Sequence, residues 1–77
     1  MSLSRQIFDK ENDKKMMLKN ISDLENRFNS LFKAGIDKND MNRMLQASGI
    51  KRKMDELKDT VNKVDEAIEE LKRQKVQ

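Results

Sequence analysis

The side chains that could carry chemistry in this chain are carboxylates and amines, because it contains no histidine and no cysteine. Adjacent acidic pairs occur at three places in the C-terminal half: Asp55–Glu56, Asp65–Glu66 and Glu69–Glu70. Paired carboxylates can act as general acids and bases, or they can bind a metal ion. On a polar helix they more often face water beside a basic residue four positions away. We expect the second situation, and therefore no catalytic residue, no metal site and no cofactor.

The segment that begins at Asp37 resembles the opening of a calcium-binding loop, with a further amide at Asn39 and a carboxylate at Asp40. Such a loop requires an oxygen ligand at its fifth position and glycine at its sixth. These positions hold Met41 and Asn42. We therefore interpret Asp37 as a helix N-cap and Asp40 as a negative charge in the following first turn.

The segment from Gly35 to Leu45 resembles the turn and second helix of a helix-turn-helix motif, and the resemblance covers about 15 residues when it is counted from Leu31. In that pattern the glycine makes the turn, and Ile36, Met41 and Leu45 pack inward. Four polar residues would then face outward, toward phosphates and base edges: Lys38, Asn39, Asn42 and Arg43. The position four before the glycine, usually small in this motif, is Leu31. A helical corner inside a bundle explains the same pattern, so nucleic-acid binding is the alternative interpretation.

A run of three basic residues, Lys51, Arg52 and Lys53, could add phosphate contacts to that alternative surface. The chain has 17 basic and 14 acidic residues, so its net charge is only +3. A modest excess of this kind is weak support for an anionic partner. A solvated helix face is the simpler interpretation of the run.

The strongest pattern is a repeat of apolar residues at alternating steps of three and four, in residues 17–31 and again in residues 47–71. This spacing places the apolar side chains in one stripe along a helix. Twelve residues form the predicted seam, through which helices would associate: Met17, Ile21, Leu24, Phe28, Leu31, Ile50, Met54, Leu57, Val61, Val64, Ile68 and Leu71.

Both glycines, Gly35 and Gly49, have a leucine four positions before them and an isoleucine directly after them. This is the frame of a Schellman helix stop. The first helix is therefore predicted to end near Ala34, and a short middle helix to run from about Lys38 to Ser48. The basic run Lys51–Lys53 opposes a second stop, since positive charge is unfavourable at a helix start. We nevertheless expect a break or a strong kink at Gly49.

The predicted fold is all-α: a helical hairpin of two long amphipathic helices joined by the short middle helix. Charged residues make up 40% of the 77 residues and there is no proline, which favours helices. Residues 16–77 are predicted to form this single hairpin domain. Residues 1–15 place Lys10 and Lys14 where the seam would continue. That segment is predicted to be frayed, or ordered by a partner.

A lone hairpin of this size buries little apolar surface, so we expect it to assemble into a helical bundle or coiled-coil oligomer. Residues beside the seam that would allow a further helix to pack are Leu18, Phe32, Thr60 and Ala67. A parallel coiled coil through the last helix is less favourable, since Lys53 would face Lys58 of the partner. The expected partner is a second copy of the chain, another helical protein, or both.

The sequence thus predicts a small protein–protein interaction or oligomerisation module, a scaffold or adaptor rather than an enzyme. The alternative is a small helix-turn-helix-like nucleic-acid-binding transcriptional regulator with a coiled-coil dimerisation helix. No apolar run reaches the ~18 residues of a membrane span, so no membrane partner is expected. The absence of cysteine leaves the compartment open, and the cytoplasm is expected as the default.

Overall fold

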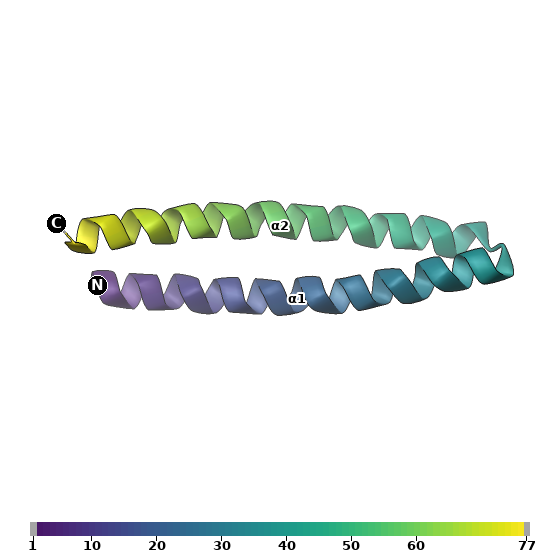
Figure 1. Ribbon diagram of the computed structural model, residues 1–77, viewed down its shortest axis with the longest axis horizontal. Helices are drawn as coiled ribbons and strands as arrows, with labels where there is room; N and C mark the ends of the chain where they lie inside the picture. The colour runs from purple at the N-terminus through teal and green to yellow at the C-terminus, as the bar shows by residue number, and fades with distance from the viewer. Residues whose placement is uncertain (1, 77) are drawn as a thin grey trace.

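The computed structural model describes residues 2–76, which form two long antiparallel helices joined by a two-residue turn (Figure 1). Helix α1 spans Leu3–Lys38 and helix α2 spans Met41–Val76, and each has 36 residues. The described chain measures 58 × 15 × 14 Å. The prediction of an all-α hairpin of two long helices is confirmed. Met1 and Gln77, the outermost residues of the two predicted segments, lie outside the described residues.

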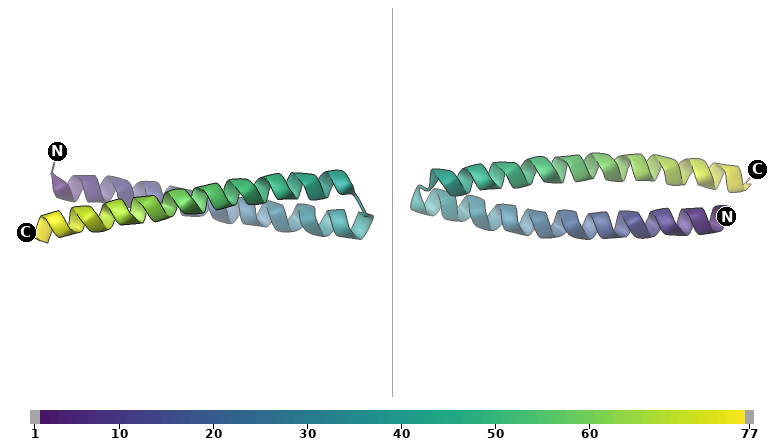
Figure 2. Two further views of the ribbon diagram at one scale, coloured as in Figure 1. Left: turned by 90° about the horizontal axis from the view of Figure 1, so that it is seen from above. Right: turned by 180° about the vertical axis from the view of Figure 1, so that it is seen from behind.

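The two helices stay side by side along their whole length and cross near the middle of the hairpin (Figure 2). The start of α1 and the end of α2 lie at the same end, opposite the turn (Figure 1). Helix α1 begins after Ser2, whose Oγ accepts a hydrogen bond from the Arg5 N–H at 3.2 Å. The segment predicted to be frayed or partner-ordered therefore lies within the first turns of α1.

The predicted stop at Gly35 is wrong, and with it the separate middle helix from Lys38 to Ser48. Helix α1 continues through Gly35, which is buried. An added Cβ there would lie 2.7 Å from the Met44 Cγ and 3.3 Å from the Asp40 carbonyl oxygen. The glycine is therefore needed for close approach of the two helices beside the turn, and not for a left-handed backbone conformation.

The Schellman stop occurs four residues later, at Asn39, which has φ 51° and ψ 45°. The Asp40 N–H donates to the Gly35 carbonyl at 2.8 Å, and the Asn39 N–H donates to the Ile36 carbonyl at 3.2 Å. This pair of hydrogen bonds closes the end of α1. Asparagine tolerates the left-handed region better than other non-glycine residues, which explains why the turn can be placed here.

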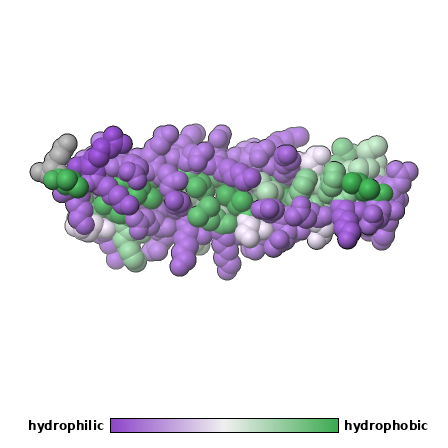
Figure 3. Space-filling model, in the orientation of Figure 1, coloured by the Kyte–Doolittle hydropathy of each residue, from purple (hydrophilic) through white to green (hydrophobic). Residues whose placement is uncertain are grey.

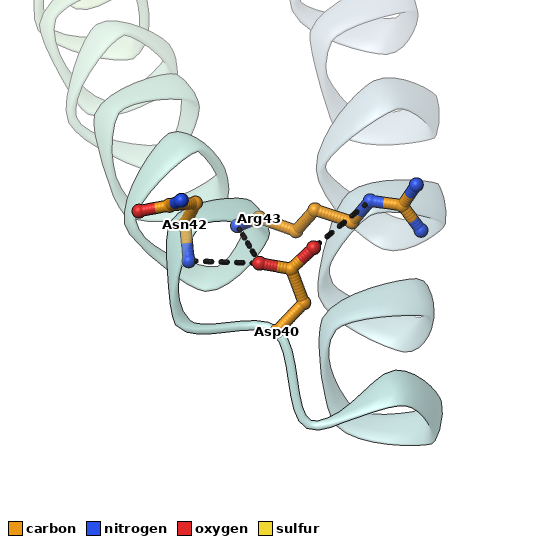
Figure 4. Close-up of polar contacts among 3 residues, drawn as sticks. All are labelled: Asp40, Asn42 and Arg43. Atoms are coloured by element: carbon orange, nitrogen blue, oxygen red, sulfur yellow. Dashed lines mark hydrogen bonds and ion pairs between the residues drawn. The ribbon is translucent and has the colours of Figure 1, made fainter.

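Asp40, and not Asp37, caps the next helix (Figure 4). The Asp40 Oδ1 accepts hydrogen bonds from the backbone N–H of Asn42 at 3.0 Å and of Arg43 at 3.4 Å. The Arg43 Nε also lies 3.5 Å from the Asp40 Oδ2. A side-chain cap of this kind stabilises a helix start by about 1 kcal/mol. It fixes the first turn of α2 directly after the two-residue turn.

The predicted break at Gly49 is also wrong, because α2 is one helix from Met41 to Val76. A glycine inside a helix costs only about 1 kcal/mol relative to alanine. Burial of Ala47 and Met54 on either side offsets that cost, since both contact α1 only while the helix stays regular. The basic run Lys51–Lys53 therefore lies inside α2. This position avoids the unfavourable interaction of positive charge with the N-terminal end of a helix.

The two glycines give a matched pair of predictions. Gly49→Ala is expected to stabilise the protein by about 0.5–1 kcal/mol, because a Cβ there meets nothing within 4 Å. Gly35→Ala is expected to destabilise it by about 1–3 kcal/mol, because the new methyl group would overlap Met44. Urea denaturation of both variants measures the difference. Equal effects would show that the helices do not approach closely at Gly35.

Candidate interaction surface

The twelve predicted seam residues all lie between the two helices of one chain. Ile21, Met54, Val61 and Ile68 are buried, and the other eight are half-buried. The seam is therefore occupied by contacts within the hairpin. Whether it also supports oligomerisation remains a prediction.

In the described part of the chain, two buried core residues lie outside that predicted set, Ile7 and Ala47. Ala47 begins the stripe of α2 and is fully buried. Ile7 is 9% exposed and lies in the segment predicted to fray. The spacing of Ile7 could have predicted its burial, because it precedes the seam residue Ile21 by two heptads, with Lys14 at the position between them.

Two ion pairs connect α1 to α2 in the half of the hairpin away from the turn. The Lys14 Nζ lies 2.6 Å from the Asp65 Oδ1, and the Lys72 Nζ lies 3.7 Å from the Glu11 Oε1. The side chains are a third to a half exposed, so each pair contributes about 0–1 kcal/mol. Lys14 occupies a seam position, where its aliphatic stem can cover apolar neighbours while its amine reaches solvent.

Large apolar side chains remain exposed outside the seam. On α1, Phe8 is 54% exposed, Leu18 48%, Phe32 44% and Ile36 56%. The rings of Phe28 and Phe32 stack with centroids 5.5 Å apart, which connects the seam to this exposed row. Figure 3 shows apolar surface along the middle of the visible face and at the end that carries the turn. Exposed apolar surface that clusters in this way marks interaction sites in many proteins.

The four residues predicted to allow a further helix to pack lie on two different sides of the hairpin: Leu18 and Phe32 on one, Thr60 and Ala67 on the other. A groove on one side is lined by Arg27, Gln46 and Lys53, and Thr60 and Ala67 follow Lys53 at intervals of seven residues. A groove on the other side contains Leu18. Phe32 follows Leu18 by two heptads and shares its side. The side that carries Leu18 and Phe32 therefore has the larger exposed apolar side chains.

The residues proposed for nucleic-acid contact do not lie on a helix-turn-helix. Lys38 ends α1, Asn39 lies in the turn, and Asn42 and Arg43 begin α2. The Arg43 guanidinium already contacts the Asp40 carboxylate. Lys51, Arg52 and Lys53 are exposed and lie two turns further along α2 than Arg43.

The inward-facing positions of that motif are exposed as well. Ile36 is 56% exposed, Met41 65% and Leu45 63%, whereas the motif would place all three inside. Met44 is half-buried against Gly35. The turn that the motif requires at Gly35 is helical instead.

The acidic pairs face solvent, apart from one carboxylate. Asp55, Glu56, Glu66, Glu69 and Glu70 are exposed, and Asp65 is half-buried with Lys14 as its partner. Among residues 2–76, no group of three or more carboxylates is placed to hold a metal ion. The grooves along the hairpin are shallow and open, with charged and apolar side chains mixed in their walls.

A comparison of the chain with protein-family models, curated proteins and solved structures finds no match. Over the described residues, neither α1 nor α2 contains a segment long and apolar enough to cross a bilayer.

Proposed function

We propose that this chain is a non-enzymatic protein–protein interaction module that acts by self-association, as a scaffold or adaptor. The observation that carries the proposal is the amount of apolar side chain left outside the hairpin. Among residues 2–76, six hydrophobic residues are buried, whereas eight large ones are exposed, by 44% to 88%. Singly exposed apolar residues need no explanation, but eight large ones on so small a hairpin do.

The shape of the hairpin supports the same proposal. Its accessible surface is 6047 Å², whereas a compact monomer of 9.1 kDa exposes about 4,900 Å². Its radius of gyration is 17.3 Å, against about 11.5 Å for a compact domain of this length. The excess of about 1,100 Å² per chain is comparable to the ~800 Å² that each partner buries in a stable interface. Two hairpins packed side by side would remove that excess, as in a four-helix bundle.

Sedimentation equilibrium of the isolated chain tests this function. We expect the mass to move from 9.1 kDa toward twice that value as concentration rises through roughly 1–100 μM, because association follows mass action. Thermal melting followed by circular dichroism should shift upward with concentration over the same range. A monomer mass throughout, with a melting temperature independent of concentration, would exclude self-association. Saturable, salt-sensitive binding to one DNA duplex over scrambled duplexes would instead favour the regulator alternative.

A further inference from the structure

One side of α1 carries a regular second row of residues next to the seam, which we name the α1 flank. Its members recur at steps of four and three, so they lie in a line along the helix. They are Ser4, Phe8, Glu11, Lys15, Leu18, Ser22, Glu25, Asn29, Phe32 and Ile36. The four apolar members are those already described as 44–56% exposed. Within one hairpin, the apolar side chains of this row therefore stay about half exposed.

The α1 flank is complementary to itself when a second copy runs in the opposite direction. Its ten positions then form five kinds of pair, in each of which the two residue numbers add up to 40. Phe8 meets Phe32, Lys15 meets Glu25, and each pair occurs twice because the contact has two-fold symmetry. The other three pairs are Ser4 with Ile36, Glu11 with Asn29, and Leu18 with Ser22. The arrangement therefore joins aromatic residues to each other and opposite charges to each other.

The matching row of α2 lies on the same side of the hairpin. The ion pair between Glu11 and Lys72 joins the two rows directly. A groove on this side is lined by Lys15 and Leu18 of α1 and by Asp65 and Lys72 of α2. We name this row the α2 flank: Met44, Ser48, Lys51, Asp55, Lys58, Asn62, Asp65, Glu69, Lys72 and Val76.

The α2 flank is complementary to itself about the same two-fold axis. In the antiparallel pairs of the α2 flank, the two residue numbers add up to 120, so the two-fold axis passes α2 at the level of residue 60. The pairs of the α1 flank add up to 40, so the axis passes α1 at the level of residue 20. Each of these levels lies about 20 residues from the Asn39–Asp40 turn, so one axis serves both helices. Met44 then meets Val76, and Lys51 meets Glu69. The like-charged pair is Asp55 with Asp65, and Asp65 already has Lys14 as its counter-ion.

We propose that the face formed by the two flanks binds a second copy of this chain, antiparallel, with α1 on α1 and α2 on α2 in a four-helix bundle. This inference rests on the proposed function and specifies its interface. The contact covers Phe8, Leu18, Phe32, Ile36 and Val76, which are five of the eight exposed large apolar residues. One whole side of the hairpin is 58 Å long and 15 Å wide, a projected area of about 870 Å², which is large enough for the ~800 Å² that each partner buries in a standard interface.

A charge-reversal experiment tests this register. Lys15→Glu alone places two carboxylates opposite each other at positions 15 and 25, and Glu25→Lys alone places two amines there, so each variant should dimerise more weakly than the parent. In a mixture of the two variants, each of the two contacts of the heterodimer joins a carboxylate to an amine, so the heterodimer should form in preference to either homodimer. The double variant Lys15→Glu with Glu25→Lys restores both attractive pairs within its own homodimer. We expect the double variant to recover most of the parent's dimer affinity, while each single variant loses about tenfold.

A matched control distinguishes the effect of a changed net charge from the effect of a changed contact between the two copies. Lys15→Glu lowers the net charge of the chain from +3 to +1, and Glu25→Lys raises it to +5, whereas the double variant keeps +3. Lys19→Glu with Glu25→Lys also keeps +3 but leaves Lys15 unchanged, because residue 19 lies outside the α1 flank. Recovery in the first double variant and not in the second supports the proposed register. Equal affinities of all these variants alongside a dimeric parent would overturn this register but leave self-association intact, and a monomeric parent would overturn both.

Disulfide formation provides a second readout that does not depend on charge. Ser4 and Ile36 are about 48 Å apart along α1, so Ser4→Cys and Ile36→Cys in one chain cannot be bridged within that chain. In the proposed dimer, position 4 of one copy faces position 36 of the other across the interface. Oxidation should therefore link the two chains efficiently. The matched control is Ser4→Cys with Lys33→Cys, because residue 33 lies outside the α1 flank. Equal cross-linking of both double variants would contradict the register.

Discussion

Substituting Val61 by aspartate is expected to unfold the hairpin and to abolish any assembly built from it. Val61 is 7% exposed in the middle of the seam, between the equally buried Met54 and Ile68. A carboxylate without a hydrogen-bonding partner costs several kcal/mol there. A domain of this size has only about 5 kcal/mol of stability to lose. Circular dichroism at 222 nm and urea denaturation measure the loss of helix directly.

Glu66→Lys is the matched control, since Glu66 is exposed in the same part of α2. It changes the charge by two units, and its expected effect on stability is within about 0.5 kcal/mol. A large loss for Glu66→Lys, or a folded Val61→Asp protein, would mean that the seam is assigned to the wrong side of α2.

Substituting Phe32 by aspartate is expected to raise the dimer dissociation constant by at least about 100-fold, while the hairpin stays folded. Phe32 is 44% exposed in one chain, so the hairpin loses only part of its packing and its stacking on Phe28. In the proposed dimer, Phe32 and Phe8 form two symmetry-related contacts, so one substitution removes both. Sedimentation equilibrium gives the dissociation constant, and circular dichroism shows whether the helices persist.

Met16→Asp controls for the general effect of replacing an exposed apolar residue on α1. Met16 is 67% exposed and lies outside the α1 flank, so its replacement should leave the dissociation constant unchanged. If both variants weakened the dimer equally, the contact would not be confined to the proposed face. If neither did, the dimer would use another surface.

The helical nature and pairing of the chain could be predicted from its sequence, because they depend on periodicity. The three–four spacing from Met17 to Leu31 and from Ile50 to Leu71 identifies the side of each helix that must leave water. Every one of those residues is buried or half-buried in the hairpin. Ile7 was missed because Lys10 and Lys14 interrupt the pattern, although Lys14 pairs with Asp65 across the seam.

The turn could not be placed from local sequence, because several residues there fit more than one role. Gly35 has the frame of a helix stop, yet the contact with Met44 determines its use, and Met44 is nine residues away. Asp37 and Asp40 are both good N-caps, and the choice follows from where α1 ends. The flanks carry too many polar residues to stand out as a stripe. Their symmetry becomes visible only when the two helices are known to be uninterrupted and antiparallel.

The position of the two helix ends determines how the molecule responds to mechanical load. Both ends lie at one end of the hairpin, opposite the turn (Figure 1). A force that pulls these ends apart separates α1 from α2 one seam layer at a time, beginning at the layer around Ile7 and continuing through the Glu11–Lys72 and Lys14–Asp65 pairs. Such unzipping requires little force. In the proposed antiparallel dimer, the ends of the two copies lie about 58 Å apart. Tension between the copies would then load the whole interface in shear, so many contacts would have to break together.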